Sequence, residues 1–254
     1  VQCILFAPAG DDYPRFAQSL GGEVIRFGGN YTVNPLDISS PAEAEYEGGE
    51  DTYALTIRSV IEMLNTHLEQ RDGMSAGEEG ILIQAAHYAY LSKGIILGEF
   101  DTYGNESPVI DDLIRGVNVI AAGGIGAATE TGVIDDEEVE HFQALGVFDD
   151  EPEEESDRSA AAKGIPISDT IVSPTEHHVS LATTLQPKFE SFKPGGINHN
   201  LNGQTNLDLS SRLVVMDMSS FADTGEMPLI LHAMLSWAYL EAKRSPYKVD
   251  VTFD

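Results

Sequence analysis

The stretch VDVTFD, from Val249 to Asp254, combines an apolar strand pattern with a closing carboxylate. Val249, Val251 and Phe253 alternate with polar residues, which is typical of a short β-strand. An acidic side chain at the carboxyl end of a strand can hold Mg²⁺ directly or through water. The stretch therefore predicts a strand and makes Asp254 a candidate metal ligand. The alternative is that the aspartate only ends the strand and caps the next turn.

The same strand closes the second of two strand–helix–strand patterns. In each pattern two apolar strands flank a helix, and this spacing favours parallel pairing within one sheet. We therefore predict an α/β fold with a mostly parallel sheet. The first pattern has a strand at 3–7, a helix at 13–20 and a strand at 23–27, and the second has a strand at 213–217, a helix at 229–243 and the strand at 249–253.

The residues between the two patterns are mainly helical in character. Apolar residues recur on one face of a helix predicted over 51–70. Ser75 and Glu78 have the spacing of a capping box, which opens the next helix. Two further helices are predicted to start with a serine followed by proline at the first helical position, at Ser107-Pro108 and Ser173-Pro174. The first three of these helices, up to the one that Ser107-Pro108 opens, indicate an all-helical insertion beside the sheet.

The chain accordingly divides into four predicted parts. They are a sheet segment at 1–40, a helical insertion at 41–122, an acidic loop or excursion at 123–172 and a second sheet segment at 173–254. Within the third part, Asp135 to Asp157 contain twelve acids and no Lys or Arg. This run predicts a solvated loop or a partly helical excursion, and an acidic docking tail is the functional alternative.

The charge of the whole chain is strongly negative. Its 254 residues carry a formal net charge of -28 and only six lysines, yet 42% of them are hydrophobic, which argues against a disordered acidic protein. A folded domain with so many surface acids resembles halophilic proteins, in which concentrated salt screens the self-repulsion. The alternative is an ordinary acidic protein with one acidic loop. Under the halophilic interpretation, net charge says little about partners, and a few Arg and Lys can still line a nucleic-acid channel.

The composition also limits the cellular context. No apolar run reaches the roughly 20 residues that span a bilayer, and no signal peptide is visible, so a cytoplasmic location is the default. The single cysteine, Cys3, leaves no partner for an internal disulfide and no multi-cysteine metal site. Because the chain starts with Val1 rather than Met, we expect an internal piece of a larger protein.

Few residues suggest chemistry by themselves. Asp217 also closes an apolar strand, so it forms a candidate pair with Asp254 at the carboxyl ends of parallel strands, where ligands collect. His177 and His178 are adjacent, and adjacent helical residues point about 100° apart, so a shared metal is not predicted. The Gly123–Gly126 run lacks the Lys-Ser/Thr ending of a phosphate loop, and no complete phosphate loop occurs in the chain. The polar loop 198–206 is either a ligand contact or turn chemistry.

The order of several segments resembles one family. The chain is similar to conjugative-transfer and type IV secretion ATPases of the TraC type, in the HerA/FtsK branch of RecA-like motors. The similar segments cover most of the chain apart from roughly 123–172, and their order carries the resemblance more than any single motif. They are GGEVIRFGGNYTVNPLDIS (21–39), AHYAYLSKGI (86–95), SPVIDDLI (107–114), HNLNGQTNLDLSSRLVVMDMSSF (199–221) and VDVTFD (249–254).

The resemblance implies a RecA-like P-loop NTPase fold, ATP and Mg²⁺ as cofactors, and assembly into a hexamer. It also implies work with membrane transfer-channel proteins, at the inner face of the cell membrane, and DNA as a partner. The phosphate-binding loop is expected just before Val1, and the water-activating Glu just after Asp254. Asp254 is then the metal-side acid, Gln204, Thr205 and Arg212 are cofactor contacts near a subunit boundary, and no catalytic residue falls inside the chain.

The sequence also departs from the family pattern. Members usually have Asp before the first proline, where this chain has Ala7-Pro8, and the turn that follows is one residue longer. These departures leave room for a non-catalytic scaffold with a degenerate nucleotide site. A second alternative, from the same superfamily, is a HerA-like DNA translocase that acts in repair or packaging. The leading hypothesis is a secretion motor, of which residues 1–254 alone are expected to be inactive.

Overall fold

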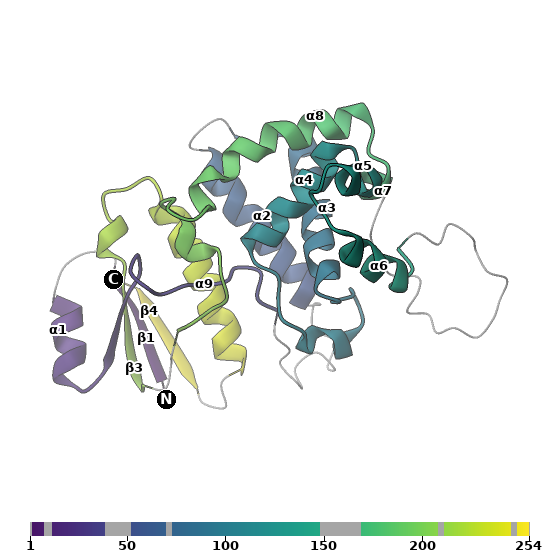
Figure 1. Cartoon of the computed structure of the whole chain (residues 1–254). Coiled ribbons are helices and arrows are strands. Elements are labelled where there is room, and N and C mark those ends of the chain that lie inside the picture. Colours follow the sequence, from purple (N-terminus) through teal and green to yellow (C-terminus); the bar gives the residue numbers. More distant parts are fainter. Residues whose placement is uncertain are drawn as a thin grey trace. The chain divides into compact units, whose positions relative to one another are not determined.

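The computed structural model describes residues 2–7, 12–38, 52–69, 73–147, 169–207, 211–244 and 248–253. The described residues form two compact units (Figure 1). The first unit comprises Val1–Asp37, Glu62–Gly73 and Ser191–Asp254, and the second comprises Ile38–Ile61 and Met74–Glu190. Helix α2 contributes residues to both units.

The first unit contains the sheet, and its four described strands run parallel. The strands are β1 (Gln2–Ala7), β2 (Glu23–Arg26), β3 (Leu213–Asp217) and β4 (Val249–Phe253), and their order across the sheet is β2-β3-β1-β4. All four match the strands predicted from the sequence. The parallel α/β sheet is thereby confirmed.

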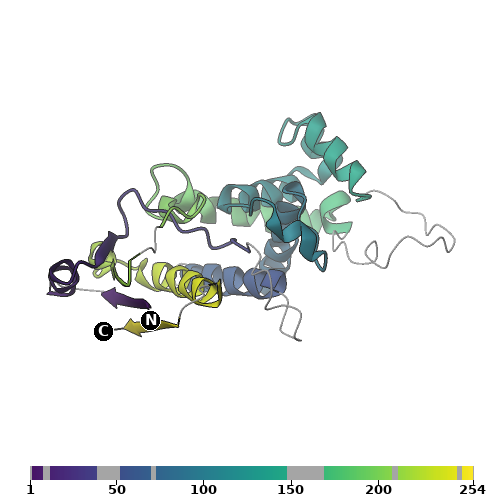
Figure 2. The same ribbon diagram turned by 90° about the horizontal axis from the view of Figure 1, so that it is seen from below.

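The two crossovers of this sheet run in opposite directions. Helix α1 (Asp12–Ser19) connects β1 to β2 past β3, and helix α9 (Met227–Arg244) lies between β3 and β4, which pair on either side of β1. Because such crossovers are right-handed, opposite directions place the two helices on opposite faces of the sheet. Figure 1 and Figure 2 show α1 and α9 on opposite sides of the strands. Ala17 of α1 packs against Ala7 and Val215 of the sheet.

The second unit is helical in its described part, as the predicted insertion requires. Its central pair is α3 (Ala76–Ser92) with α4 (Ile110–Ala122), and both also contact α8 (Glu176–Leu185). The remaining helical elements are α2 (Thr52–Glu69), α5 (Ile125–Glu130), α6 (Asp136–Ala144), α7 (Asp169–Val172) and the 3-10 helices Phe100–Gly104 and Gln186–Phe192. None of the described helices is long and apolar enough to cross a membrane.

A local sequence signal explains the start of α3. Ser75 is its N-cap, accepting a hydrogen bond from the Glu78 amide, while the Glu78 carboxylate accepts from the Ser75 amide at 2.9 Å. Lys188 then forms an ion pair with the same carboxylate at 2.6 Å. The capping box predicted from the sequence is therefore confirmed, and Glu78 also fixes the residues that follow α8.

The two Ser-Pro predictions were each wrong by two residues. Helix α4 begins at Ile110 and α8 at Glu176, so neither proline is the first helical residue. The Ser107 hydroxyl instead accepts a hydrogen bond from the amide of Ile38 at 3.0 Å, and the Asp112 carboxylate caps α4 by accepting from the Val109 amide at 2.8 Å. At α8 the cap is Thr175, whose hydroxyl accepts from the His178 amide.

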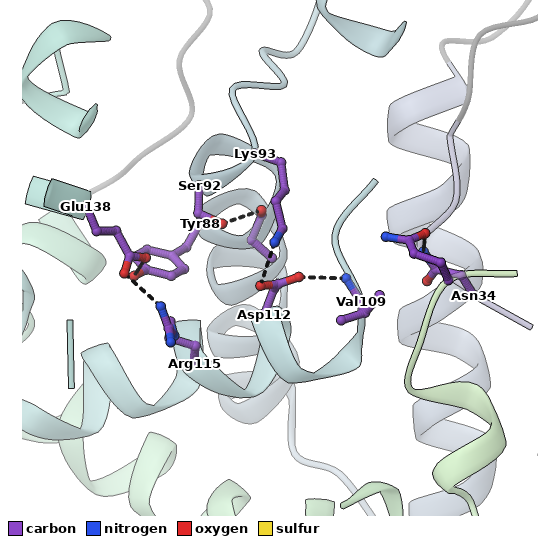
Figure 3. A network of polar contacts seen from close by, with 10 residues as sticks. Asn34, Tyr88, Ser92, Lys93, Val109, Asp112, Arg115 and Glu138 are labelled. Atoms are coloured by element: carbon purple, nitrogen blue, oxygen red, sulfur yellow. Dashed lines mark hydrogen bonds and ion pairs between the residues drawn. The ribbon is translucent and has the colours of Figure 1, made fainter. Parts of the chain in front are cut away.

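Polar contacts also connect α3, α4 and α6 (Figure 3). Glu138 of α6 accepts hydrogen bonds from the Tyr88 hydroxyl and from Arg115, the latter at 2.9 Å. Lys93 forms an ion pair with Asp112 at 3.1 Å. Only part of the acidic run Asp135 to Asp157 is described, and α6 supplies its helical portion; 148–157 lie outside the described residues.

The close approach of α3 and α4 makes Gly116 a sensitive position. A Cβ atom at Gly116 would lie 2.7 Å from the Ala85 carbonyl oxygen and 2.9 Å from its Cα. We expect Gly116→Ala to lower the free energy of unfolding by about 1–3 kcal/mol, because backbone atoms cannot move aside cheaply. Helix-resolved hydrogen exchange of α3 and α4, together with urea unfolding followed by circular dichroism, measures the effect.

The matched control for this prediction is Gly80→Ala. Gly80 also lies in a helix, and a Cβ atom there has no other atom within 4 Å. This change should raise the free energy of unfolding by about 0.5–1 kcal/mol through helix propensity. Equal effects of the two substitutions would contradict the predicted contact.

Candidate functional site

The carboxyl edge of the sheet is the place where a parallel α/β fold offers a site. In the strand register Asp217 of β3 lies between Ala7 of β1 and Arg26 of β2. On the other side of β1, Phe253 of β4 lies opposite Phe6. All four strands therefore end at this edge.

Asp217 is buried at the edge and is already engaged. Its Oδ2 atom lies 3.2 Å from Arg26 Nε, and its Oδ1 atom accepts a hydrogen bond from the Ser219 amide at 3.0 Å. Burial alone would raise the pKa of the Asp217 carboxyl, but the hydrogen bonds from Ser219 and Arg26 outweigh it and lower that pKa. Asp217 thus acts as an ionised cap of the turn after β3, which is the structural alternative raised for both aspartates.

Asp254, the predicted metal ligand, lies outside the described residues. The strand before it, β4, is described as far as Phe253 and ends at the same edge as β1 and β3. Strand β1 separates β4 from β3, so the axes of those two strands lie about 10 Å apart. The two strand ends of the predicted Asp217–Asp254 pair are therefore not adjacent.

Gln204 and Thr205 lie in a polar clasp, which we define as the contacts between 29–36 and 198–206. The Thr205 hydroxyl accepts a hydrogen bond from the Asn34 amide at 3.0 Å, and Gln204 Oε1 accepts from Asn34 Nδ2 at 3.2 Å. Asn34 Oδ1 in turn accepts from the Leu36 amide at 3.0 Å, forming the turn of the Asn-Pro-Leu-Asp segment. Two of the segments quoted for the family resemblance thus bind each other.

Two further asparagines complete the polar clasp. Asn206 Oδ1 accepts from the Thr32 amide at 2.8 Å, and its Nδ2 donates to the Asn30 carbonyl at 3.0 Å. Asn200 is buried and donates to the carbonyls of Gly29 and Tyr31. Side-chain amides therefore satisfy the backbone of a segment that forms neither helix nor strand.

Arg212 lies at the opposite edge of the sheet. It directly precedes β3, its carbonyl accepts a hydrogen bond from the Cys3 amide at 2.8 Å, and its side chain is exposed. Asp217 is at the other end of the same strand. The structure therefore brings Gln204 and Thr205 together and keeps Arg212 apart from the carboxyl edge.

No group of three or more His, Cys, Asp or Glu side chains that could hold a metal occurs in the described residues. His178 lies at the start of α8, where its Nδ1 atom accepts from the Thr175 amide at 3.4 Å. Mg²⁺ commonly binds one or two carboxylates together with phosphates and water, so it does not require such a cluster. The glycines of the Gly123–Gly126 run have a structural role, since Gly123 ends α4 in the left-handed conformation with φ of 103°.

The first unit also contains a buried polar cluster that the sequence did not reveal. His67 Nδ1 lies 3.0 Å from Glu226 Oε2, and Asn198 Nδ2 donates to the same oxygen at 2.9 Å. Asn198 also donates to the Ser191 hydroxyl at 3.1 Å. These residues come from α2, from the residue before α9 and from 191–198, so only the fold brings them together.

Comparisons with known proteins found one kind of similarity, which is to a solved structure and concerns the fold. No protein-family model matches the chain, and no curated protein matches it either. Among solved structures, VirB4 of Thermoanaerobacter pseudethanolicus is similar, with a TM-score of 0.62 and 18% sequence identity. The alignment covers 100% of this chain and 74% of that chain. The chain therefore shares the fold of that structure, and the α/β fold with a parallel sheet that the sequence predicted is confirmed.

The lowered pKa of Asp217 makes its contribution to stability depend on pH. The folded-state pKa lies below the unfolded value of about 3.9, so the contribution is present above that value and is lost as pH falls through the folded-state pKa. We expect Asp217→Asn to lower the free energy of unfolding by about 2 kcal/mol at pH 7. The difference from the wild type should shrink below about pH 4. Urea titrations that follow Trp237, which is buried in the first unit, measure it.

Asp250→Asn is the matched control for Asp217. Asp250 pairs with Lys248 at 3.1 Å on the same sheet, but both side chains are largely exposed. Its replacement should change the free energy of unfolding by less than about 1 kcal/mol. A cost for Asp217→Asn that stays constant from pH 7 to pH 3 would contradict an ionised Asp217.

The polar clasp yields a separate prediction at Asn34. Asn34→Ala removes the side-chain bond to Gln204 and the hydrogen bond that the buried Leu36 amide makes to the Asn34 side chain. We expect the free energy of unfolding of the first unit to fall by about 2 kcal/mol. Asn206→Ala removes two bonds at an exposed site that water can replace, so its cost should be smaller. The Trp237 signal reports both, and equal costs would show that burial at Asn34 is not decisive.

Proposed function

We propose that the chain is part of an ATP-driven motor for DNA or protein transfer, of the type IV secretion and conjugation class. The observation that carries the proposal is the similarity to VirB4, which extends over the whole chain. The ordered sequence segments point to the same class, and they include both halves of the polar clasp. In this proposal the motor assembles as a hexamer with membrane transfer-channel proteins at the cytoplasmic face of the cell membrane.

The outer edge of β4 suggests where the nucleotide would bind in this proposal. Among the described strands β4 pairs only with β1, and Val251 on it is 36% exposed. A further parallel strand can pair there through unused backbone groups. We place the strand that leads into the phosphate loop at this edge, because the loop would then end beside the carboxyl end of β4.

Asp254 would then hold Mg²⁺ at the end of β4. The ion supplies charge neutralisation for the phosphates of ATP and for the phosphoryl group during transfer. In this proposal the parallel strand β4, which directly precedes Asp254 in the chain, would position this carboxylate, as electrostatic stabilisation of a transition state requires. Because the residue that activates water is expected beyond Asp254, residues 1–254 alone should not hydrolyse ATP.

The test uses the protein with its flanking sequence and Asp254→Asn. We expect saturating ATP with Mg²⁺ to stabilise the protein by about 2.7 kcal/mol when ATP is at 100 times its Kd. The asparagine variant should lose at least about 100-fold in ATP turnover, because a neutral amide balances less phosphate charge. Thermal shift and phosphate release measure the two effects.

Asp250→Asn serves again as the control, since it removes a carboxylate from the same strand at an exposed position. Its turnover should match the wild type. If ATP causes no thermal shift in the protein with its flanking sequence, the proposed motor function is wrong and a non-catalytic scaffold is favoured. Turnover by residues 1–254 alone would contradict the proposed positions of the phosphate loop and of the water-activating residue.

A further inference from the structure

Arg26 is an exposed cation whose position is fixed by a buried partner. It is the last residue of β2, and its side chain is 68% exposed while that of Asp217 is 6% exposed. The contact joins Arg26 Nε to Asp217 Oδ2 at 3.2 Å. The described residues make no other bond to the Arg26 side chain, so they leave both of its terminal nitrogens as potential donors.

Asp217 is itself held in place, which restricts the guanidinium. The Ser219 amide binds Asp217 Oδ1, and the Asp217 backbone pairs with β1 and β2 on its two sides. A planar guanidinium anchored through Nε presents its two terminal nitrogens together on the far side, and this fork matches the oxygens of a phosphoryl group. Asp217 contacts the guanidinium only through Nε, so it does not occupy the fork of terminal nitrogens.

The exposed residues next to Arg26 have small or polar side chains. Gly28, Gly29 and Asn30 follow it in the chain and are exposed, as are Ser219 and Ser220 on the neighbouring turn. A Cβ atom at Gly28 would lie 3.6 Å from Ser220 Cβ, so the two turns are in contact. The other acids on these two segments are Glu23 at the start of β2 and Asp223 beyond the serines.

We propose that Arg26, with the Ser219–Ser220 turn, binds a phosphoryl group at the carboxyl edge of the sheet. Parallel sheets collect ligands at this edge, and a chain with a net charge of -28 has few exposed cations to offer an anion. The site goes beyond the proposed motor and does not depend on it. Its ligand is a small polyphosphate, either free or carried by a nucleotide.

This phosphoryl site is separate from the one proposed at β4. Strands β2 and β4 are the two outer strands of the described sheet, so three strand spacings, about 14 Å, lie between their axes. An arginine side chain cannot bridge that distance within one chain. A phosphate bound by Arg26 is therefore a second ligand of the chain or belongs to a nucleotide that another copy presents.

The experiment titrates sodium pyrophosphate into the 254-residue chain at constant 0.15 M KCl. Isothermal titration calorimetry gives the affinity, and the side-chain NMR signal of Arg26 reports whether the guanidinium is involved. Arg26→Gln should weaken binding at least 10-fold. Arg26→Lys, which keeps the charge and can still reach Asp217, should weaken it at least 3-fold because the fork is lost.

Arg115→Gln is the matched control for the lost charge. Arg115 is also a half-exposed arginine held by one carboxylate, that of Glu138 at 2.9 Å, but it lies on α4 of the other unit. Its affinity for pyrophosphate should equal that of the wild type. Circular dichroism of each variant ensures that folded proteins are compared, and Arg26→Lys keeps the test decisive if the glutamine variant unfolds.

A parallel titration with ATP distinguishes the two sources of the phosphoryl group. If Arg26→Gln weakens both ligands equally, the site recognises the polyphosphate alone, and if it weakens only ATP, the ligand is a nucleotide. Unchanged affinity of Arg26→Gln for both ligands, or an equal loss in Arg115→Gln, would overturn the proposal. Because the readout is binding to the chain without hydrolysis, failure here leaves the proposed motor untouched.

Discussion

The structure depends on the pairing of β1 with two strands from the far end of the chain. Cys3 lies opposite both Leu213 and Asp250, so the central strand has no neighbour from its own part of the sequence. The sheet therefore forms only after the residues between have been looped out. The entropy of closing such a loop grows slowly with its length, which is why a complete helical unit can occupy the loop without preventing the sheet. The long loop is expected to slow folding instead, because parallel pairing between strands far apart in the sequence is intrinsically slow.

The polar clasp shows how the fold holds a segment that lacks regular structure. Residues 29–36 leave the sheet immediately after β2 and must satisfy their backbone groups without a ladder. Asn200, Gln204, Thr205 and Asn206 provide the required donors and acceptors, and these side chains come from one short polar stretch ahead of β3. The stretch is thus tied to the sheet through both the clasp and the strand that follows it. Its asparagines act as structural residues in the described part of the chain.

The helices and strands could be predicted well from the sequence, but the long-range side-chain contacts between them could not. The strands were predictable because short apolar runs that end at Gly, Pro or Asp are typical of buried strands. The Ser75–Glu78 capping box was predictable because its hydrogen bonds join residues that are close in sequence. The starts of α4 and α8 were misplaced because Ser107 serves a distant backbone amide and Thr175 is the stronger local cap. Likewise the Arg26–Asp217 contact and the His67–Glu226–Asn198 cluster join residues far apart in the chain. No periodicity or spacing encodes such contacts, so the sequence left Asp217 as either a metal ligand or a cap of the next turn and did not indicate Arg26 as its partner.

The outer edge of β4 has a consequence for the behaviour of the chain in concentrated solution. An unpaired strand edge is a template on which another molecule can add a strand, and this is a common route to aggregation. Lys248 and Asp250 place opposite charges at this edge, with Val251 partly exposed between polar neighbours. Charged residues on edge strands discourage uncontrolled strand addition. These charges therefore oppose self-association at this edge, while the backbone groups of β4 stay available to the additional strand that we proposed there.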